Sequence, residues 1–508
     1  MLLQTNFQVS ETRAFFEMLR EEMQKTPEAE VGTLTETASF TKILDIADII
    51  RAQLHDIGSD RDAVVAICAE KSPHSVAAIL GVLSSGLAYA PLDPSHPDTR
   101  LTSILDDLAP PVLIVDDATR SRFEVWARRS GTQLLTFSEL PKTVPPVPVA
   151  SGAQRSLAAV LHTSGSTGKP KRVLIEAPAL DAFQSWVVGE ISIDIDDCVL
   201  SHAPFAFDLS FLDIFASLAG GACLALADTK TARNGPKLVE MMQQHNVTIW
   251  HSAPSALKLV AEAACELTLP QVRCVLFAGE PMQSRLLRQL FRIFPNARFI
   301  NIYGCTETND TFFYDVPRID TPDPLPLGRK LPYVDYILVD NADMPVSGEG
   351  QGELWVRCPT MMRGYSDQQL TAKATGWRDG VGYYRTGDMV RRDANGMVHF
   401  IGRNDTIVKL SGVRVDLNEI EACLQAHPLV DEAAAYVDKS GDTAVLNAFV
   451  SSKSDELNSI DLRLYLMKRL PTAAIPRKFT ISIQEVPKNS NGKACRRMLE
   501  QQLVETQT

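Results

Sequence analysis

Short apolar segments alternate with amphipathic segments along the chain up to about residue 300. Most of the apolar segments are rich in β-branched residues and are bounded by polar or turn residues, which is typical of buried strands. Between them, apolar residues at helical spacing predict helices, and this β/α alternation predicts layered α/β architecture with largely parallel sheets. The predicted strands are Val64–Cys68, Val112–Val115, Ala159–His162, Ile249–His251, Val275–Phe277 and Phe299–Ile302, and the predicted helices include Ser75–Leu83, Gly235–Gln244, Ala256–Ala264 and Gln283–Phe294.

The pattern changes after about Gly350, where glycine-bounded apolar segments predict antiparallel strands. From Asn404 onward, strands and helices mix over a short distance, which predicts a small α+β unit. The predicted strands of this region are Gly352–Arg357, Gly382–Tyr384 and Met397–Ile401, and its helices are Asn418–Leu424 and Leu462–Arg469.

Composition narrows the class of protein. The 508 residues are 45% hydrophobic and 22% charged, as in an ordinary soluble globular protein of several structural units. The net charge of -12 argues against a nucleic-acid-binding surface. Nine cysteines without CxxC spacing predict reduced thiols in a cytoplasmic protein. No signal peptide is predicted, because Met1–Phe16 lacks a basic start followed by an apolar stretch. No membrane span is predicted, because the most apolar segment, Val76–Leu92, is interrupted by Ser84, Ser85 and Gly86.

A loop of glycine and hydroxyl residues carries the strongest chemical signal. It follows the predicted strand Ala159–His162 and ends in lysine. The backbone N–H groups of such a loop can surround an anion, and the hydroxyl groups add donors with little bulk. The spacing differs from that of a P-loop, and a flexible surface loop is the alternative. The predicted phosphate-binding residues are Thr163, Ser164, Gly165, Ser166, Thr167, Gly168 and Lys169.

This loop resembles the phosphate loop of the adenylate-forming enzymes, a group that contains non-ribosomal peptide synthetase adenylation domains, acyl-CoA synthetases and firefly luciferase. More motifs of this family follow in the family's order, from Gly86–Pro94 to Lys493. The resemblance implies a large N-terminal core (1–404) of layered α/β subdomains plus a distorted β-barrel. It also implies a small mobile α+β lid (405–508) with a hinge at Asp405, for which a turn carboxylate is the alternative. ATP and Mg²⁺ are the implied cofactors.

Two further motifs of the resemblance concern the nucleotide. In the segment 301–308, Asn301 and Tyr303 would contact adenine, Thr306 would contact phosphate, and Glu307 would bind Mg²⁺. An aromatic face can stack on adenine, and a carboxylate oxygen suits Mg²⁺ that is bridged to phosphate. In the segment 384–388, Asp388 would accept hydrogen bonds from both ribose hydroxyl groups. The resemblance also assigns Gly279, Glu280, Gly304 and Arg403 to the ATP site.

Two C-terminal motifs resemble the family's segments for its two reaction steps. Lys493 would contact the substrate carboxylate and the α-phosphate during adenylation. Gly412 would then let the pantetheine arm of a carrier protein pass close to the backbone. No carrier motif of the form Gly-x-Asp-Ser occurs in the chain, so the resemblance implies a separate carrier protein as partner.

The segment Phe205–Phe215 resembles the family's specificity segment. Asp208 falls where amino-acid-activating members bind the α-ammonium group, although it could instead cap a helix. Most of the implied pocket positions are aliphatic, which predicts a small side-chain space and resembles L-proline-activating ligases. Serine, alanine and a modified proline stay open, because the polar groups of His251 and Asp310 could instead bind a hydroxyl group. The implied pocket consists of Asp208, Leu209, Leu212, His251, Leu276, Ala278, Ile302, Asp310 and Thr311, with Lys493.

Three other functions share some of these motifs. An acyl-CoA ligase shares every core motif but leaves Asp208 unexplained. A luciferase-like oxygenase shares them too, but no residue argues for oxygen chemistry. A non-catalytic binding protein predicts loss of the catalytic positions, whereas Lys493, Glu307 and Asp388 are present. The sequence therefore predicts an amino-acid-adenylating ligase.

Overall fold

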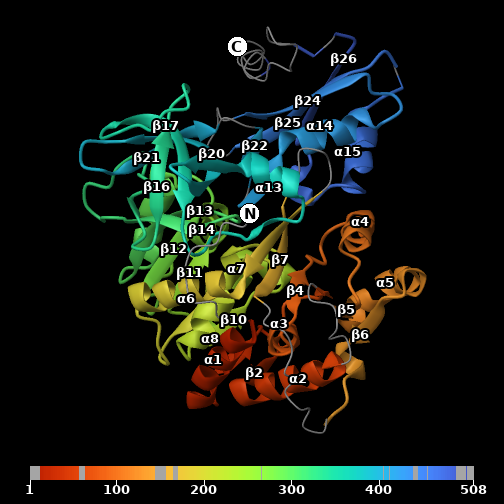
Figure 1. Cartoon of the computed structure of the whole chain (residues 1–508), viewed down its shortest axis with the longest axis vertical. Coiled ribbons are helices and arrows are strands. Elements are labelled where there is room, and N and C mark those ends of the chain that lie inside the picture. Colours follow the sequence, from red (N-terminus) through yellow and green to blue (C-terminus); the bar gives the residue numbers. More distant parts are fainter. Residues whose placement is uncertain are drawn as a thin grey trace. The chain divides into compact units, whose positions relative to one another are not determined.

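The computed structural model describes residues 12–55, 63–143, 156–163, 170–264, 266–403, 406–410, 412–438, 444–454, 456–484, 486–487 and 499. These residues form two compact units (Figure 1). The first takes in the described residues within Met1–Pro94, Leu108–His162 and Arg172–Asn404. The second takes in those within Ser95–Asp107, Thr163–Lys171 and Asp405–Thr508.

A nine-stranded sheet is the largest element of the first unit. From β1 to β13 along this sheet, neighbouring strands are parallel, and antiparallel strands complete both edges. The central strands β9, β11 and β12 are buried along their whole length because helices cover both faces. In order the strands are β15 (Arg329–Lys330), β14 (Asn309–Asp315), β13 (Arg298–Cys305), β12 (Cys274–Ala278), β11 (Ile249–Ser252), β9 (Cys198–Ser201), β10 (Cys223–Leu226), β1 (Glu30–Gly32) and β2 (Thr37–Ser39).

Alternate residues of each central strand enter different cores. Trp250 of β11 and Phe277 of β12 pack with α10, α11 and α12. Ile249 of β11 and Leu276 of β12 belong to the core on the opposite face, together with α6, α8 and the helical segment around Phe215. The helices that precede residue 404 are α1 (Thr12–Lys25), α2 (Phe40–Gln53), α3 (Pro73–Ser84), α4 (Asp98–Leu108), α5 (Asp117–Ser130), α6 (Ala177–Ile191), α7 (Leu209–Phe211), the π-helical turn η3 (Leu212–Ala216), α8 (Ser217–Ala219), α9 (Thr229–Ala232), α10 (Gly235–Gln244), α11 (Pro254–Ala263), α12 (Ser284–Ile293) and α13 (Gln368–Ala374), with the 3₁₀ turn η2 (Phe137–Glu139).

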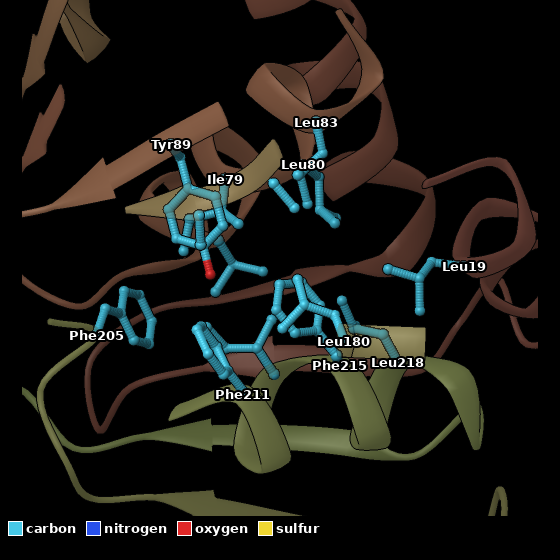
Figure 2. Close-up of a cluster of buried hydrophobic side chains, with 14 of the residues drawn as sticks. Leu19, Ile79, Leu80, Leu83, Tyr89, Leu180, Phe205, Phe211, Phe215 and Leu218 are labelled. Atoms are coloured by element: carbon cyan, nitrogen blue, oxygen red, sulfur yellow. The ribbon is translucent and has the colours of Figure 1, made fainter. Parts of the chain in front are cut away.

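A seven-stranded sheet shares this second core with the nine-stranded sheet. Figure 2 shows the shared layer: Ile79 and Leu80 of α3 lie across from Phe211 and Phe215 of the specificity segment. The segment that the sequence predicts to bind substrate is therefore anchored by large buried side chains. The strands are β18 (Gly364–Tyr365), β8 (Lys171–Glu176), β7 (Leu157–Thr163), β4 (Ala88–Pro91), β3 (Val64–Cys68), β5 (Val112–Val115) and β6 (Gln133–Thr136).

A five-stranded antiparallel sheet completes the first unit. Its core includes Leu338, Leu354 and Val390. The strands are β16 (Asp335–Val339), β17 (Gly350–Arg357), β20 (Val381–Arg392), β19 (Thr375–Arg378) and β21 (Val398–Arg403).

The second unit carries its own apolar core, built from residues such as Ile420, Leu462 and Val450. An antiparallel hairpin and a three-stranded sheet pack with two helices around this core. The elements are β22 (Ile407–Leu410), β23 (Val413–Asp416), α14 (Leu417–Gln425), β24 (Glu432–Asp438), β25 (Val445–Ser451), α15 (Ser459–Met467), the 3₁₀ turn η4 (Thr472–Ala474) and β26 (Lys478–Ser482).

The predicted α/β class, with a large and a small domain, is confirmed. The predicted bounds of β3 and β5 match the structure. Two predicted elements exist, but their predicted bounds were wrong. The strand predicted at Gly382–Tyr384 extends from Val381 to Arg392, because alternate burial continues through polar residues that sequence patterning treats as a loop. The helix predicted from Leu462 begins at Ser459, where the side chain of Asn458 caps it.

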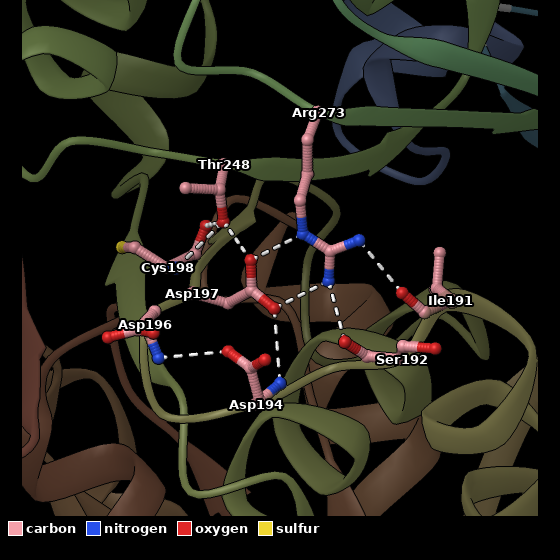
Figure 3. Close-up of polar contacts among 8 residues, drawn as sticks. All are labelled: Ile191, Ser192, Asp194, Asp196, Asp197, Cys198, Thr248 and Arg273. Carbon is pink, nitrogen blue, oxygen red and sulfur yellow. Dashed lines mark hydrogen bonds and ion pairs between the residues drawn. The ribbon is translucent and has the colours of Figure 1, made fainter.

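An ion pair between the buried Asp197 and the partly exposed Arg273, called here the Asp197–Arg273 clamp, connects the starts of the parallel strands (Figure 3). Asp197, immediately before β9, accepts hydrogen bonds from Nε and Nη2 of Arg273 at 2.7 and 2.6 Å and from Oγ1 of Thr248 at 2.7 Å. Arg273 precedes β12 and also donates to the backbone oxygens of Ile191 and Ser192. Burial opposes the ionisation of Asp197, but these hydrogen bonds outweigh it and hold the pKa of the carboxyl below its ordinary value.

Replacing Arg273 tests this clamp. We expect Arg273→Met to lower the free energy of unfolding by about 2 kcal/mol, because Asp197 loses its charged donor. Since the pKa of Asp197 is depressed in the folded state, its contribution is present above the ordinary aspartate pKa of about 3.9 and is lost as the pH falls. Urea titrations at pH 7 and pH 3 should therefore show a smaller difference from wild type at pH 3. Arg292→Met, at an exposed arginine, is the control and should change stability by less than about 0.5 kcal/mol. An equal loss at both pH values would contradict the ionic clamp.

Candidate active site

Three strands of the first unit bring the implied ribose-binding residues together. The Tyr303 hydroxyl on β13 donates a hydrogen bond to Oδ2 of Asp388 on β20. The Arg403 guanidinium on β21 donates to Oδ1 of the same carboxylate and, at 3.0 Å, to the backbone oxygen of Thr386. Burial, followed by the nearby Asp388 charge, raises the pKa of Tyr303 well above its ordinary value, so its hydroxyl stays a donor. Asp388 is thereby held in one orientation by a neutral donor and a cation.

The implied metal ligand is buried beside two tyrosines. Glu307 is fully buried in the turn between β13 and β14, and its Oε1 accepts a 2.6 Å hydrogen bond from the Tyr365 hydroxyl. The hydroxyl groups of Tyr365 and Tyr384 lie 3.5 Å apart. Thr306 opens the same turn and is partly exposed. The turn therefore presents a carboxylate whose orientation is fixed by a phenol from another strand.

Other implied nucleotide residues have structural partners. The side-chain Nδ2 of Asn301 donates to the backbone oxygen of Pro326 at 2.8 Å. Gly279 follows β12 with a φ of 89°, a conformation that favours glycine. Glu280 accepts a 3.0 Å hydrogen bond from the backbone N–H of Ser255 at the start of α11. These contacts order the loops at the carboxyl ends of β12 and β13.

The sheet register places several implied pocket residues on one face. In β11 and β12, His251 pairs with Leu276, and in β12 and β13, Ala278 pairs with Ile302. Leu276, Ala278 and Ile302 all belong to the core that also contains Leu212 of the π-helical turn. In parallel strands, paired residues point to the same face. The four strand residues therefore share one face of the nine-stranded sheet, and Leu212 lies in the core on that face, as the implied pocket requires.

The remaining pocket residues lie at the rim of this face. Asp310 and Thr311 on β14 are buried, and the Thr311 hydroxyl donates to the backbone oxygen of Tyr303 at 3.1 Å. Asp208 and Leu209 are partly exposed at the start of α7. Asp208 stands at the N-cap position of α7 with helical φ and ψ, and its side chain makes no capping hydrogen bond there.

Two charged residues beside the pocket were missed by the sequence reading. Asp213, on the π-helical turn, is fully buried, and its Oδ1 lies 3.8 Å from Nδ1 of the buried His251. Lys71 is also buried, with Nζ 3.0 Å from the backbone oxygen of Ser201 and 2.9 Å from its Oγ. Burial lowers the pKa of Lys71 to about 8, although the Asp213 charge opposes the shift. A sequence signal exists for Asp213, because it is the single acidic residue inside the otherwise apolar segment 211–216.

Several predicted residues lie outside the described part of the chain: Ser164, Gly165, Ser166, Thr167, Gly168, Lys169, Asp405 and Lys493. Thr163, just before them, ends β7 and is buried. In the second unit, Gly412 lies between β22 and β23 with a φ of 77°, where glycine relieves backbone strain. Across the described ranges, no cluster of three or more potential metal-ligating side chains occurs, and no helix is both long and apolar enough to cross a membrane.

Comparison with known proteins agrees with this arrangement. The model of the AMP-binding enzyme family matches residues 19–366, and that of the AMP-binding enzyme C-terminal domain matches residues 419–493. The chain therefore belongs to the family of AMP-binding enzymes.

Two curated relatives within this family are each named L-proline–L-prolyl-carrier protein ligase. The one from Streptomyces coelicolor is 34% identical over 482 residues, covering 89% of this chain and 90% of the relative. The one from Pseudomonas fluorescens is 32% identical over 469 residues, covering 89% and 91%. Among solved structures, the Vibrio cholerae adenylation domain AlmE, in complex with glycyl-adenosine-5'-phosphate, shares the fold with a TM-score of 0.83 at 22% identity over 99% of both chains.

Gly304 offers a test of the turn that carries Glu307. A Cβ atom at Gly304 would lie 2.2 Å from the backbone oxygen of Asn309, so β13 and β14 would have to separate. We expect Gly304→Ala to lower the free energy of unfolding by about 1–3 kcal/mol and to weaken ATP binding, measured by denaturation and calorimetry. Gly402→Ala is the control, because its added Cβ would meet nothing within 4 Å. Unchanged stability of Gly304→Ala would mean that the turn adapts freely.

Proposed function

We propose that this protein activates a small amino acid with ATP and transfers it to the phosphopantetheine thiol of a separate carrier protein. The similarity to two L-proline–L-prolyl-carrier protein ligases, over about nine tenths of both chains, carries this proposal. The first product is an aminoacyl adenylate, formed with release of pyrophosphate. L-proline is the lead substrate. Serine, alanine or a modified proline are the alternatives, because His251 and Asp310 add polar groups to the pocket wall.

The geometry around Asp388 supports the nucleotide assignment. A buried carboxylate held by Tyr303 and Arg403 can accept hydrogen bonds from the ribose hydroxyl groups without reorienting. Asn301 and Tyr303 would contact adenine, and Thr306 and the glycine- and hydroxyl-rich loop that follows β7 would contact the phosphates. Gly279 and Glu280 would line the same nucleotide site. Positioning and neutralisation of charge are the main contributions that phosphoryl chemistry needs from a protein.

The residues present fit Mg²⁺ that arrives with the nucleotide. Glu307 is a hard oxygen ligand held by Tyr365, and the described residues contain no acidic cluster that would hold the ion alone. Mg²⁺ typically binds through one or two carboxylates plus substrate phosphates, which matches a single glutamate. When bound, the ion would neutralise the charge on the phosphate oxygens.

The proposed reaction has two steps. The substrate carboxylate oxygen attacks the α-phosphorus of ATP, the bond to the bridging oxygen breaks, and pyrophosphate leaves. Lys493 would stabilise the charge that develops on the α-phosphate. The carrier thiol then attacks the acyl carbon of the mixed anhydride, AMP leaves, and a thioester forms. Rotation of the C-terminal domain about Asp405 would replace Lys493 with the Gly412 segment between the two steps. Such a reaction suits the cytoplasm, where ATP is available.

Amino-acid-dependent exchange of labelled pyrophosphate into ATP tests the proposal. We expect exchange with a small amino acid of about the size of proline and loss of that exchange in Asp208→Asn. Removing the charge that faces the α-ammonium group should lower kcat/KM by about 100-fold or more. Asp228→Asn is the control, since Asp228 caps α9 through the backbone N–H of Thr231 and should leave exchange unchanged. Exchange supported only by acids without an amino group would favour an acyl-CoA ligase instead.

Lys493 separates the two steps. We expect Lys493→Ala to abolish adenylate formation and to leave transfer from a preformed aminoacyl adenylate to the carrier largely intact, because the lysine acts only in the first step. Rapid-quench measurement of each half-reaction gives both rates. Equal loss in both half-reactions would contradict the separation of the steps.

A further inference from the structure

Two histidines, just after β9 and on the neighbouring β11, differ in their hydrogen bonding. His202, just after β9, places Nε2 2.9 Å from the backbone oxygen of Ala232 and Nδ1 3.0 Å from Oγ of Ser252. Burial lowers its pKa to about 4, so it is a neutral structural residue. His251 on β11 is less exposed than His202, yet neither of its ring nitrogens has a hydrogen-bond partner among the described residues.

Carboxylates surround His251 instead. Its Nδ1 lies 3.8 Å from Oδ1 of Asp213, an ion-pair distance that is too long for a direct hydrogen bond. Burial opposes a charged ring, but Asp213 and then Asp310 and Asp208 outweigh it and raise the pKa of His251 above its ordinary value. A protonated imidazole has a donor on each nitrogen. His251 therefore offers N–H groups that the described protein does not use.

The position of His251 in the sheet indicates which ligand its N–H groups can reach. The register with Leu276 puts His251 on the sheet face that also carries Ala278 and Ile302. It is thus a polar point in an aliphatic wall. A buried donor without a partner is costly, and few native structures keep one unless a ligand or water uses it. The substrate's side chain is the ligand that the implied pocket brings to this wall.

The charges of the neighbourhood restrict what that side chain can be. Asp213 acts on both Lys71 and His251, Asp310 and Asp208 act on His251, and Asp93 and Glu70 act on Lys71, so carboxylates outnumber cations in this neighbourhood. The α-ammonium group of an amino acid adds a positive charge to this excess. A second charge, on the substrate's side chain, would be buried against the aliphatic wall, which is expensive at low dielectric constant. A neutral side chain with a hydrogen-bond acceptor fits both conditions.

We propose that His251, oriented by Asp213, donates a hydrogen bond to a side-chain hydroxyl oxygen of the substrate, so that the preferred amino acid is hydroxylated. Hydroxylated proline and serine share this chemistry at the size of the pocket. Asp213 acts through His251 and is a positioning residue. The inference rests on the proposed function, because it concerns the amino acid that the same site adenylates, and it favours the modified-proline and serine alternatives over L-proline.

Pyrophosphate exchange with matched pairs of substrates tests the inference on the wild-type protein. The pairs are L-proline with 3- and 4-hydroxy-L-proline, and L-alanine with L-serine. We expect kcat/KM for the hydroxylated member of one pair to exceed that of its parent at least about tenfold, since the parent leaves the buried N–H unpaired. The pair that responds identifies the substrate. Equal or better use of the parent in both pairs, or a preference for a basic side chain, would overturn the inference and leave the proposed function standing. No exchange with any amino acid would contradict the proposed function itself.

Variants assign the preference to the two residues. His251→Leu should reduce the ratio of the two kcat/KM values to about one, and His251→Gln, which keeps a donor, should retain part of it. Asp213→Asn should lower the ratio mainly through a higher KM for the hydroxylated substrate, since the ring loses its orientation. His202→Gln removes the neighbouring histidine, which is partly buried and already hydrogen-bonded, and should leave the ratio unchanged, whatever its effect on stability. A ratio that survives in both His251 variants would show that another group reads the hydroxyl.

Discussion

A carboxylate buried in the layer between two sheets organises the first unit. Asp213 lies on the π-helical turn η3 with no exposed surface, and an ion in that position is stable only with compensating charge nearby. Lys71, from the connection between β3 and α3, and His251, from β11, supply that charge. One residue thus couples the seven-stranded sheet, the specificity segment and the nine-stranded sheet. The position of the specificity segment, and with it the pocket, depends on this balance.

The stabilising ion pair and the implied nucleotide-binding residues lie at opposite ends of the same parallel strands. The Asp197–Arg273 clamp fixes the starts of β9, β11 and β12. At the carboxyl ends lie Gly279, Glu280 and the turn with Glu307, where ligands bind in open parallel sheets. Because the clamp fixes the starts of the strands, the polar groups at their carboxyl ends can keep their positions. The antiparallel strands β20 and β21 then add Asp388 and Arg403 to that edge.

Much of this could be predicted from the sequence, because the relevant signals are local. Strands such as β3 and β5 are short apolar runs, and the nucleotide motifs are contiguous segments whose residue types match their chemistry. The extent of β20 could not be predicted, because its polar residues alternate with buried ones that pack only in the folded sheet. The pairing of Asp213 with Lys71 could not be predicted either. The two residues are more than a hundred positions apart in the chain, and a charge inside an apolar segment does not reveal which distant charge balances it. His251 was predicted as a pocket residue, but its position beside the buried Asp213 was not.

The most direct test of the account follows one turnover by mass spectrometry. The protein would be mixed with ATP, Mg²⁺ and a mixture of small amino acids, first alone and then with a phosphopantetheine-bearing carrier protein. The account predicts that an aminoacyl adenylate accumulates on the protein, and that the carrier converts it into a thioester with release of AMP. Failure to form any aminoacyl adenylate, or transfer to free coenzyme A in preference to the carrier, would contradict it.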